Sequence, residues 1–338
     1  MSELRKDPAT GRWIITGTRT ESDFFDMLNN PKPIATEECF FCEGNEHLTL
    51  PEIYAVRNPG TARNGSGWQI RVVPSKSAVF TSDEQLVKIG YGIYDWMKNI
   101  GAHELIIETP QHIKNICDLS YDQITSILQV YKERMADLAR DERFKYCLIF
   151  KNQRPKSPIR YGHAHSQLVA LPFIPKLIKD EFSAAREYFS YKERCVYCDI
   201  VRQEQKERKR IVEENGDYIS FVPYAAKFAF ELCIIPKNHN SDYSKESAVS
   251  IANLANILKI SLQKISRVLN DPPLSYVLHT APYPRLVHGS WLTIEKDYHW
   301  HIEIYPQVSE IMGFELGSGV HIQPLLPEIC AKMLKEAK

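Results

Sequence analysis

Hydrophobic and polar residues alternate in several short segments of the first half of the chain, and these segments are predicted to be β-strands. A different spacing follows Ser120, where apolar positions from Ile124 to Leu138 recur with the period of a helix. We therefore expect a helix from about Ser120, its N-cap, to Arg140. The expected strands cover residues 68–74, 104–108, 146–150 and 163–171, and residues 1–20 are expected to form an extended ribbon.

The second half of the chain repeats this order of elements. Residues 229–239 can be laid on residues 102–112, with an alanine, a glutamate, a leucine, an isoleucine and a final histidine coinciding. The remaining counterparts are strands over 218–223, 276–279 and 298–304 and a helix over 247–269. An ordered repeat of this kind predicts two α+β modules, residues 1–180 and 181–338, joined by the charged, helical stretch near 175–192.

Composition places the chain among ordinary globular proteins. Of its 338 residues, 43% are hydrophobic and 11% aromatic, and the formal net charge is zero. Without an overall field to attract them, neither nucleic acid nor an anionic membrane is an expected partner. The first residues lack an apolar signal segment, and no apolar run is long enough to span a bilayer. A cytoplasmic protein is expected.

Eight cysteines require an explanation, and four of them form two C-x-x-C pairs. In a cytoplasmic chain such pairs favour metal or redox chemistry over structural disulfides, and neither pair has the strand-to-helix context of a thioredoxin-like redox motif. Each pair is followed, in the same order, by a histidine at a strand end and by an H-x-H motif. Because structural zinc takes four tetrahedral ligands, often two thiolates and two imidazoles, two zinc sites are predicted. Their ligands are Cys39, Cys42, His112 and His163 in the first module, and Cys195, Cys198, His239 and His299 in the second.

The other four cysteines lie in apolar segments and are expected to be buried thiols. They are Cys117, Cys147, Cys233 and Cys330.

The first H-x-H motif, His163-Ala164-His165, carries the candidate chemistry. Side chains two positions apart on a strand share a face, so His163, His165 and Gln167 are expected on one side of the predicted strand. One ring could hold a metal while the other reacts with a substrate. A lone H-x-H is more often a structural pair, and it is the accompanying cysteines, histidines and repeat that favour a site here.

This order of motifs resembles the galactose-1-phosphate uridylyltransferase family of the histidine-triad superfamily, over nearly the whole chain. Local matches are Leu4–Pro8 with Gly11–Trp13, and the first C-x-x-C with Pro51-Glu52. The serine of His-x-His-Ser-Gln and the stretch Gly313–Gly319 most resemble the plant ADP-glucose phosphorylase branch. The resemblance implies a histidine-triad-like fold for each module, an antiparallel sheet (half-barrel) with packed helices.

The resemblance also implies a ping-pong nucleotidyl transfer. His165 would attack the α-phosphorus of a nucleotide sugar and expel a sugar 1-phosphate; another sugar 1-phosphate, or inorganic phosphate, would then accept the nucleotidyl group. Imidazole suits this role because it is a neutral nucleophile near pH 7. Gln167 would donate its amide to a phosphoryl oxygen, and His163, held by zinc, would fix the strand.

Further substrate contacts and a homodimer follow from the resemblance alone. The glycine-rich stretch Gly313–Gly319 could bring backbone amides to the sugar or phosphates, and a plain loop is the alternative. The implied substrate-binding residues are Arg19, Asn152, Gln153, Ser166, Gly317 and Gly319.

The sequence departs from the family pattern in several places, of which two bear on the chemistry. The bulky segment Arg154–Arg160 stands where relatives have a small-residue loop, and Glu303 stands in the second module where Gln167 stands in the first. A carboxylate there would repel a phosphate, so one catalytic centre is expected. The substrate stays open: a uridylyltransferase, an ADP-glucose phosphorylase and a nucleotide-binding relative without turnover all fit.

Overall fold

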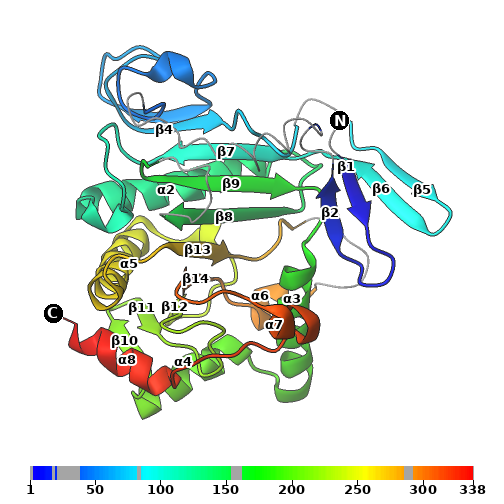
Figure 1. The fold of residues 1–338 in the computed structure, drawn as a ribbon, viewed down its shortest axis with the longest axis vertical. Helices are drawn as coiled ribbons and strands as arrows, with labels where there is room; N and C mark the ends of the chain where they lie inside the picture. Colours follow the sequence, from blue (N-terminus) through cyan, green and yellow to red (C-terminus); the bar gives the residue numbers. More distant parts are fainter. Residues whose placement is uncertain are drawn as a thin grey trace.

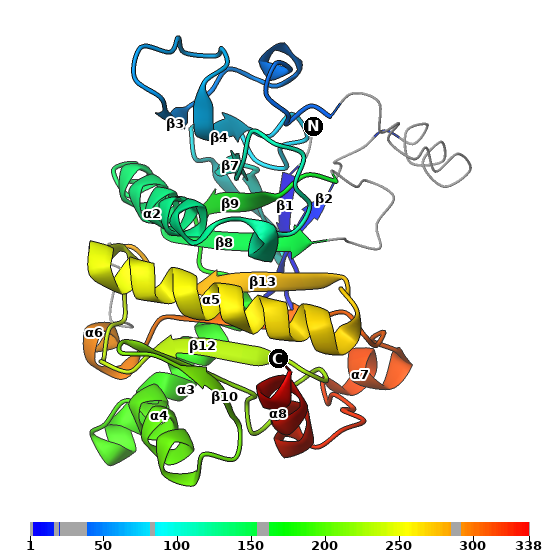
Figure 2. The same ribbon diagram turned by 90° about the vertical axis from the view of Figure 1, so that its left-hand side faces the viewer.

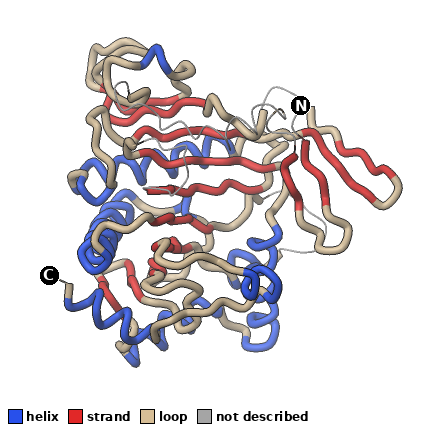
Figure 3. Tube along the Cα trace, viewed as in Figure 1, coloured by secondary structure: helices blue, strands red, loops and turns tan. Residues whose placement is uncertain are grey.

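The computed structural model describes residues 3–16, 20, 39–81, 85–153, 162–284 and 292–337. Arg19 and the segment Arg154–Arg160 lie outside these residues. The described chain folds into two sheets in which all neighbouring strands are antiparallel, with helices packed around them (Figures 1 and 3). The predicted α+β class is confirmed.

A ten-stranded sheet runs through both halves of the chain (Figure 1). Read from its two outer edges inward, the strand order is the same in each half, and the halves join where β8 pairs with β13. The predicted duplication is therefore confirmed as a single continuous sheet. The first half contributes β3 (Tyr54–Arg57), β4 (Trp68–Pro74), β7 (Ala102–Ile107), β9 (His165–Leu171) and β8 (Tyr146–Gln153); the second contributes β10 (Ile211–Glu214), β11 (Tyr218–Phe221), β12 (Leu232–Pro236), β14 (His301–Pro306) and β13 (Leu274–His279).

Two long helices, α2 (Tyr121–Leu138) and α5 (Ala248–Leu269), lie side by side across one face of this sheet (Figure 2). Each begins after the serine that caps it, since Ser120 accepts from the backbone N–H of Gln123 and Ser247 from that of Ser250. Their apolar stripes form the main core with strands from both modules. This face is called the helix-covered face below.

The opposite face is only partly covered. A four-stranded sheet packs on it at the first module, and α3 (Lys176–Lys192) packs on it through Ile178 and Phe182. The predicted boundary at residue 180 falls inside α3, and the division into residues 1–180 and 181–338 stays a prediction. The small sheet consists of β2 (Trp13–Thr16), β1 (Glu3–Lys6), β6 (Tyr94–Lys98) and β5 (Lys88–Tyr91).

Short elements complete the described chain. No helix among its residues is both long and apolar enough to cross a membrane. The alternative of a plain loop at Gly313–Gly319 is wrong, because Gly313–Ser318 form a helix, α7, which ends at Gly319 with a φ of +72°. The other helices are α4 (Val196–Glu207), α6 (Ile294–Asp297) and α8 (Pro327–Glu336), and single 3₁₀ turns occur at Glu46–Leu48, Ile116–Asp118 and Tyr243–Lys245.

Candidate active site and metal centres

His165 is the first residue of β9 and lies on the partly covered face of the sheet. The expectation that His163 and His165 belong to one strand is wrong, because His163 precedes β9. The alternation of side chains along β9 therefore does not determine where the ring of His163 points. The Nδ1 atom of His165 lies 2.8 Å from the backbone carbonyl of His163. A carbonyl can only accept, so Nδ1 carries the proton and Nε2 carries the lone pair.

The surroundings of His165 keep its ring neutral. Its side chain is buried, and the ring of Phe41 lies 5.2 Å from it between centroids. Burial, and then the charge of Lys151, lower the pKa of His165 to about 4. At neutral pH the ring is therefore an unprotonated imidazole with its lone pair on Nε2, the state that a nucleophile requires.

Ser166 does not share the face of His165. Its hydroxyl is fully buried on the helix-covered face, where it bonds to Glu108 and Tyr131. Beside it, the Lys151 Nζ atom donates to Glu108 at 2.6 Å and to the carbonyl of His165 at 2.9 Å. The alternation of β9 imposes this placement, and the structure assigns Ser166 to a buried polar network under the strand instead of to a substrate contact.

Gln167 does share the face of His165, as predicted, and it has a partner that the sequence did not reveal. Its Oε1 atom lies 2.9 Å from the Nε2 atom of His103 on the adjacent strand β7. Asn152 lies on the same face of β8, where its Oδ1 atom accepts from Ser275 at 2.8 Å. Gln153 points the other way, and its Oε1 atom accepts from the backbone of Ile116 at 3.3 Å.

The first predicted metal set comes together as expected. The candidate ligand atoms of Cys39, Cys42, His112 and His163 all lie within 4.8 Å of one another. The Nδ1 atom of His163 lies 3.4 Å from Cys39 Sγ, while its Nε2 atom lies 2.7 Å from the carbonyl of Thr109. The carbonyl orients the ring and keeps the proton on Nε2, so Nδ1 faces the thiols as a ligand.

The second predicted set comes together in the same way. Cys195, Cys198, His239 and His299 place one ligand atom each within the same 4.8 Å limit. The His239 Nδ1 atom lies 3.3 Å from Cys198 Sγ, and its Nε2 atom lies 2.9 Å from the carbonyl of Glu295. A hydrogen bond with Cys195 lowers the pKa of Cys198 to about 7, which favours a thiolate. Both donor sets fit the tetrahedral thiolate–imidazole coordination that zinc prefers.

A third cluster was not predicted. Glu181, His279, His301 and Glu303 also lie close enough to hold a metal. His279 is sandwiched between two carboxylates, with Nδ1 3.1 Å from Glu181 and Nε2 3.5 Å from Glu303. Burial opposes its protonation, but these two carboxylates raise the pKa of His279 above its ordinary value. Sequence spacing could not reveal the cluster, because Glu181 reaches it from α3.

The register of the sheet makes Gln167 and Glu303 structural counterparts. Gln167 pairs with Leu105 as Glu303 pairs with Cys233, and both are linked through Phe150 and Val277 across the centre of the sheet. The aromatic contact is repeated as well, since the ring of Tyr197 stacks on His301 at 5.1 Å. The second module thus has the same arrangement with a carboxylate where the first has an amide.

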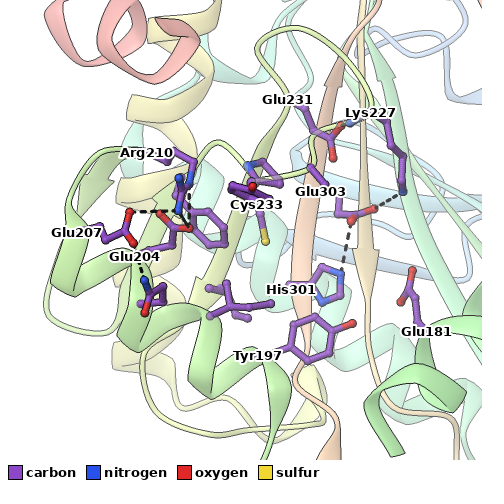
Figure 4. Close-up of a pocket in the computed structure, with 17 residues that line it drawn as sticks. Glu181, Tyr197, Glu204, Glu207, Arg210, Lys227, Glu231, Cys233, His301 and Glu303 are labelled. Carbon is purple, nitrogen blue, oxygen red and sulfur yellow. Dashed lines mark hydrogen bonds and ion pairs between the residues drawn. The ribbon is translucent and has the colours of Figure 1, made fainter. Parts of the chain in front are cut away.

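A cavity of about 660 Å³ lies beside His301 (Figure 4). The two cationic side chains that line it, Arg210 and Lys227, both form ion pairs. Arg210 donates to Glu204 and Glu328, and the Nζ atom of Lys227 lies 3.9 Å from a carboxylate oxygen of Glu303. Because carboxylates predominate, the cavity is electrostatically unsuited to a phosphate. Those that line it are Glu181, Glu204, Glu207, Glu231 and Glu303.

The predicted substrate contacts at Gly317 and Gly319 are not beside His165 within this chain. Both residues belong to α7 or its C-terminal end, which lies at the second module, away from β9 in both views (Figures 1 and 2). Arg19 lies outside the described residues.

Two family models match most of the chain. Residues 75–175 match the N-terminal domain of galactose-1-phosphate uridyl transferase, and residues 181–336 match its C-terminal domain. The chain belongs to the galactose-1-phosphate uridylyltransferase family. This is a family of transferases, and the chain is accordingly an enzyme of that class.

Relatives of this uridylyltransferase-family chain extend over its full length. ADP-glucose phosphorylase from Arabidopsis thaliana is 33% identical over 99% of this chain and 92% of its own length. A solved uridylyltransferase structure is 29% identical with a TM-score of 0.81, covering 99% of this chain and 98% of that one. A solved Arabidopsis thaliana ADP-glucose phosphorylase with bound ADP-glucose is also 29% identical, with a TM-score of 0.76 over the whole of both chains.

Proposed function

We propose that this family member transfers a nucleoside monophosphate from a nucleotide sugar to a second acceptor through a nucleotidyl-His165 intermediate. The observation that carries the proposal is the bond from His165 Nδ1 to the carbonyl of His163, which leaves the lone pair on Nε2 of a buried, neutral ring. Family membership supplies the class of reaction.

The reaction has two displacements at the same phosphorus. In the first, His165 Nε2 forms a bond to the α-phosphorus, and the bond to the departing sugar 1-phosphate breaks. In the second, an oxygen of the acceptor forms a bond to phosphorus and His165 leaves as neutral imidazole. Gln167 stabilises the charge on the phosphoryl oxygens through its amide N–H groups.

Two zinc ions are part of the proposal. Cys39, Cys42, His112 and His163 would hold one, and the corresponding set of the second module the other. The first ion would fix His163, whose carbonyl in turn fixes the ring of His165.

Two acceptors are candidates. A hexose 1-phosphate acceptor, with UDP-glucose as the proposed donor, is in keeping with the family name, which describes uridyl transfer and galactose 1-phosphate. Inorganic phosphate, with ADP-glucose as donor, is favoured by the 33% identical relative, which is named for that activity.

We also propose a homodimer and retain the remaining substrate contacts. The segment around α7 exposes a concentration of apolar side chains that is typical of an interface. Four of them are 62–76% exposed: Met312, Leu316, Ile322 and Leu326.

Asn152 is proposed to contact substrate from the face of His165, while Arg19, Gly317 and Gly319 stay as predicted contacts.

A labelling experiment tests the proposal. Protein is incubated with UDP-glucose or ADP-glucose carrying a labelled α-phosphate, and the labelled residue is identified by peptide mass spectrometry. We expect label on His165, release of glucose 1-phosphate, and discharge of the label by galactose 1-phosphate or inorganic phosphate. The His165→Ala variant should lose at least about 1,000-fold in rate.

The His301→Ala variant is the matched control, because His301 has the equivalent position in a module that lacks the glutamine. It should label at the wild-type rate. If the wild-type protein binds nucleotide without covalent label, the non-catalytic alternative is supported. If the wild-type protein is labelled on His301, the assignment of one catalytic centre is contradicted.

A further inference from the structure

His103 lies on β7, on the same face of the sheet as Gln167. In the register of β7 and β9, His103 is opposite Val169 and Leu105 is opposite Gln167. The imidazole therefore reaches diagonally across the strand pair to place Nε2 2.9 Å from Gln167 Oε1.

This contact decides which end of the Gln167 amide is available to a substrate. A carboxamide has an oxygen that only accepts and a nitrogen that donates two hydrogen bonds. A phosphoryl group presents acceptor oxygens, so the nitrogen end attracts it and the oxygen end repels it. With the oxygen bonded to His103, the nitrogen end is left for the phosphoryl group. Within the described part of the chain, no residue accepts from that nitrogen.

The surroundings of His103 determine its tautomer. Its Nδ1 atom is buried and has no partner among the described residues. A proton on Nδ1 would be a buried N–H without an acceptor, whereas a proton on Nε2 is bonded to Gln167. Burial also lowers the pKa of His103, which keeps the ring in its neutral form.

We propose that His103 is a positioning residue for nucleotidyl transfer, because it holds the oxygen of Gln167 so that the amide nitrogen faces the reacting phosphoryl group. The inference rests on the proposed function and adds a residue that does not itself touch the substrate. Nothing in the sequence singles out His103, since its role depends on the pairing of two strands more than 60 residues apart.

A double-mutant cycle tests this assignment through the rate of formation of nucleotidyl-His165. The His103→Phe variant keeps a ring of similar size and removes the donor. We expect the rate to fall about 10- to 50-fold, with the KM for the nucleotide sugar changed less than about threefold. In a Gln167→Ala background the same substitution should have no further effect, because the amide that it orients is gone.

Rescue and stability controls separate positioning from packing. His103→Gln restores an N–H donor and should recover most of the rate. Val169→Ala removes apolar contact opposite His103 without touching the amide, and should lower Tm while leaving the rate unchanged.

Three outcomes would overturn the assignment: a His103→Phe rate within about twofold of wild type, losses that multiply in the Gln167→Ala background, or no recovery in a folded His103→Gln protein. Absence of label on wild-type His165 would instead overturn the proposed function and the role of His103 with it, so the two failures are distinguishable.

Discussion

A histidine that acts as a nucleophile must stay unprotonated while it remains close to charged substrate groups. In this protein His165 is buried near the ammonium group of Lys151, and both effects disfavour a second proton on the ring. The bond to the carbonyl of His163 then selects the nitrogen that keeps the lone pair. Protonation state and tautomer are therefore set by separate contacts of one side chain.

The low pKa of His165 predicts an unusual pH profile. An ordinary histidine, with a pKa near 6.5, would lose most of its nucleophilic form by about pH 5.5, whereas His165 with a pKa of about 4 would not. We expect the rate of His165 labelling to change less than about twofold between about pH 7 and pH 5.5, measured by rapid quench. A rate that halves near pH 6.5 would contradict this prediction.

The same pKa shift affects stability. Below about pH 6.5 the unfolded chain binds a proton at His165, while the folded chain does so only near pH 4. The free energy of unfolding should therefore fall as the pH falls through this window.

At the scale of elements, a buried ion pair links β8 to Glu108, the residue that follows β7, and so spans β9, which lies between these two strands. Lys151 and Glu108 are 1% and 0% exposed and 2.6 Å apart, and the same ammonium group donates to the backbone of β9. The cost of removing these charges from water is offset only if both partners are present. The strand that carries His165, the proposed nucleophile, thus depends on a pair located on the opposite side of the sheet.

Breaking this pair should be strongly destabilising. The Lys151→Met variant leaves the carboxylate of Glu108 buried without its cation, and we expect the free energy of unfolding to fall by about 3–5 kcal/mol in urea titrations. The Lys151→Met/Glu108→Gln double variant removes both charges and should recover a large part of that loss. A double variant as unstable as the single one would show that the ion pair is not the cause.

At the scale of the whole molecule, two similar modules share one sheet and differ in chemistry. Each places a C-x-x-C pair against two histidines, and each places an aromatic ring beside a histidine at the start of the equivalent strand. Only the first has Gln167 at the following position of that face; the second has Glu303 and a cavity lined by carboxylates. Both modules therefore contain a cluster that could hold a metal ion, and only the first has an amide where the second has a carboxylate.

The two metal sets predict a defined stoichiometry. We expect about two zinc ions per chain by elemental analysis. The Cys42→Ser variant should lose one ion and the Cys198→Ser variant the other. The Cys117→Ser variant changes a buried thiol outside both sets and should keep both ions. Removal by a chelator should lower Tm by at least about 5 °C in calorimetry, because the folded chain alone has the assembled sites. Equal zinc content in all three variants would contradict the assignment.

Much of the fold and of the metal sites was predictable from local and repeated patterns. The first long helix begins after its predicted cap, Ser120, the second begins within one residue of the predicted start at residue 247, and the C-x-x-C pairs meet the expected histidines. Alternation on a strand placed Gln167 on the face of His165. The same rule, applied to Ser166, would have placed its hydroxyl on the buried face, and the motif resemblance led to the wrong expectation.

The sequence by itself determined which residues can react and which can bind metal, since these properties belong to residue type and spacing. Only the tertiary structure decided which nitrogen of His165 carries the lone pair and which end of Gln167 faces outward. The first depends on the path of the chain before β9, which brings the carbonyl of His163 to Nδ1 of His165, and the second depends on the pairing of β7 with β9. His103, Lys151 and the Glu181 cluster could not be predicted, because their partners are distant in the chain and become neighbours only in the folded structure.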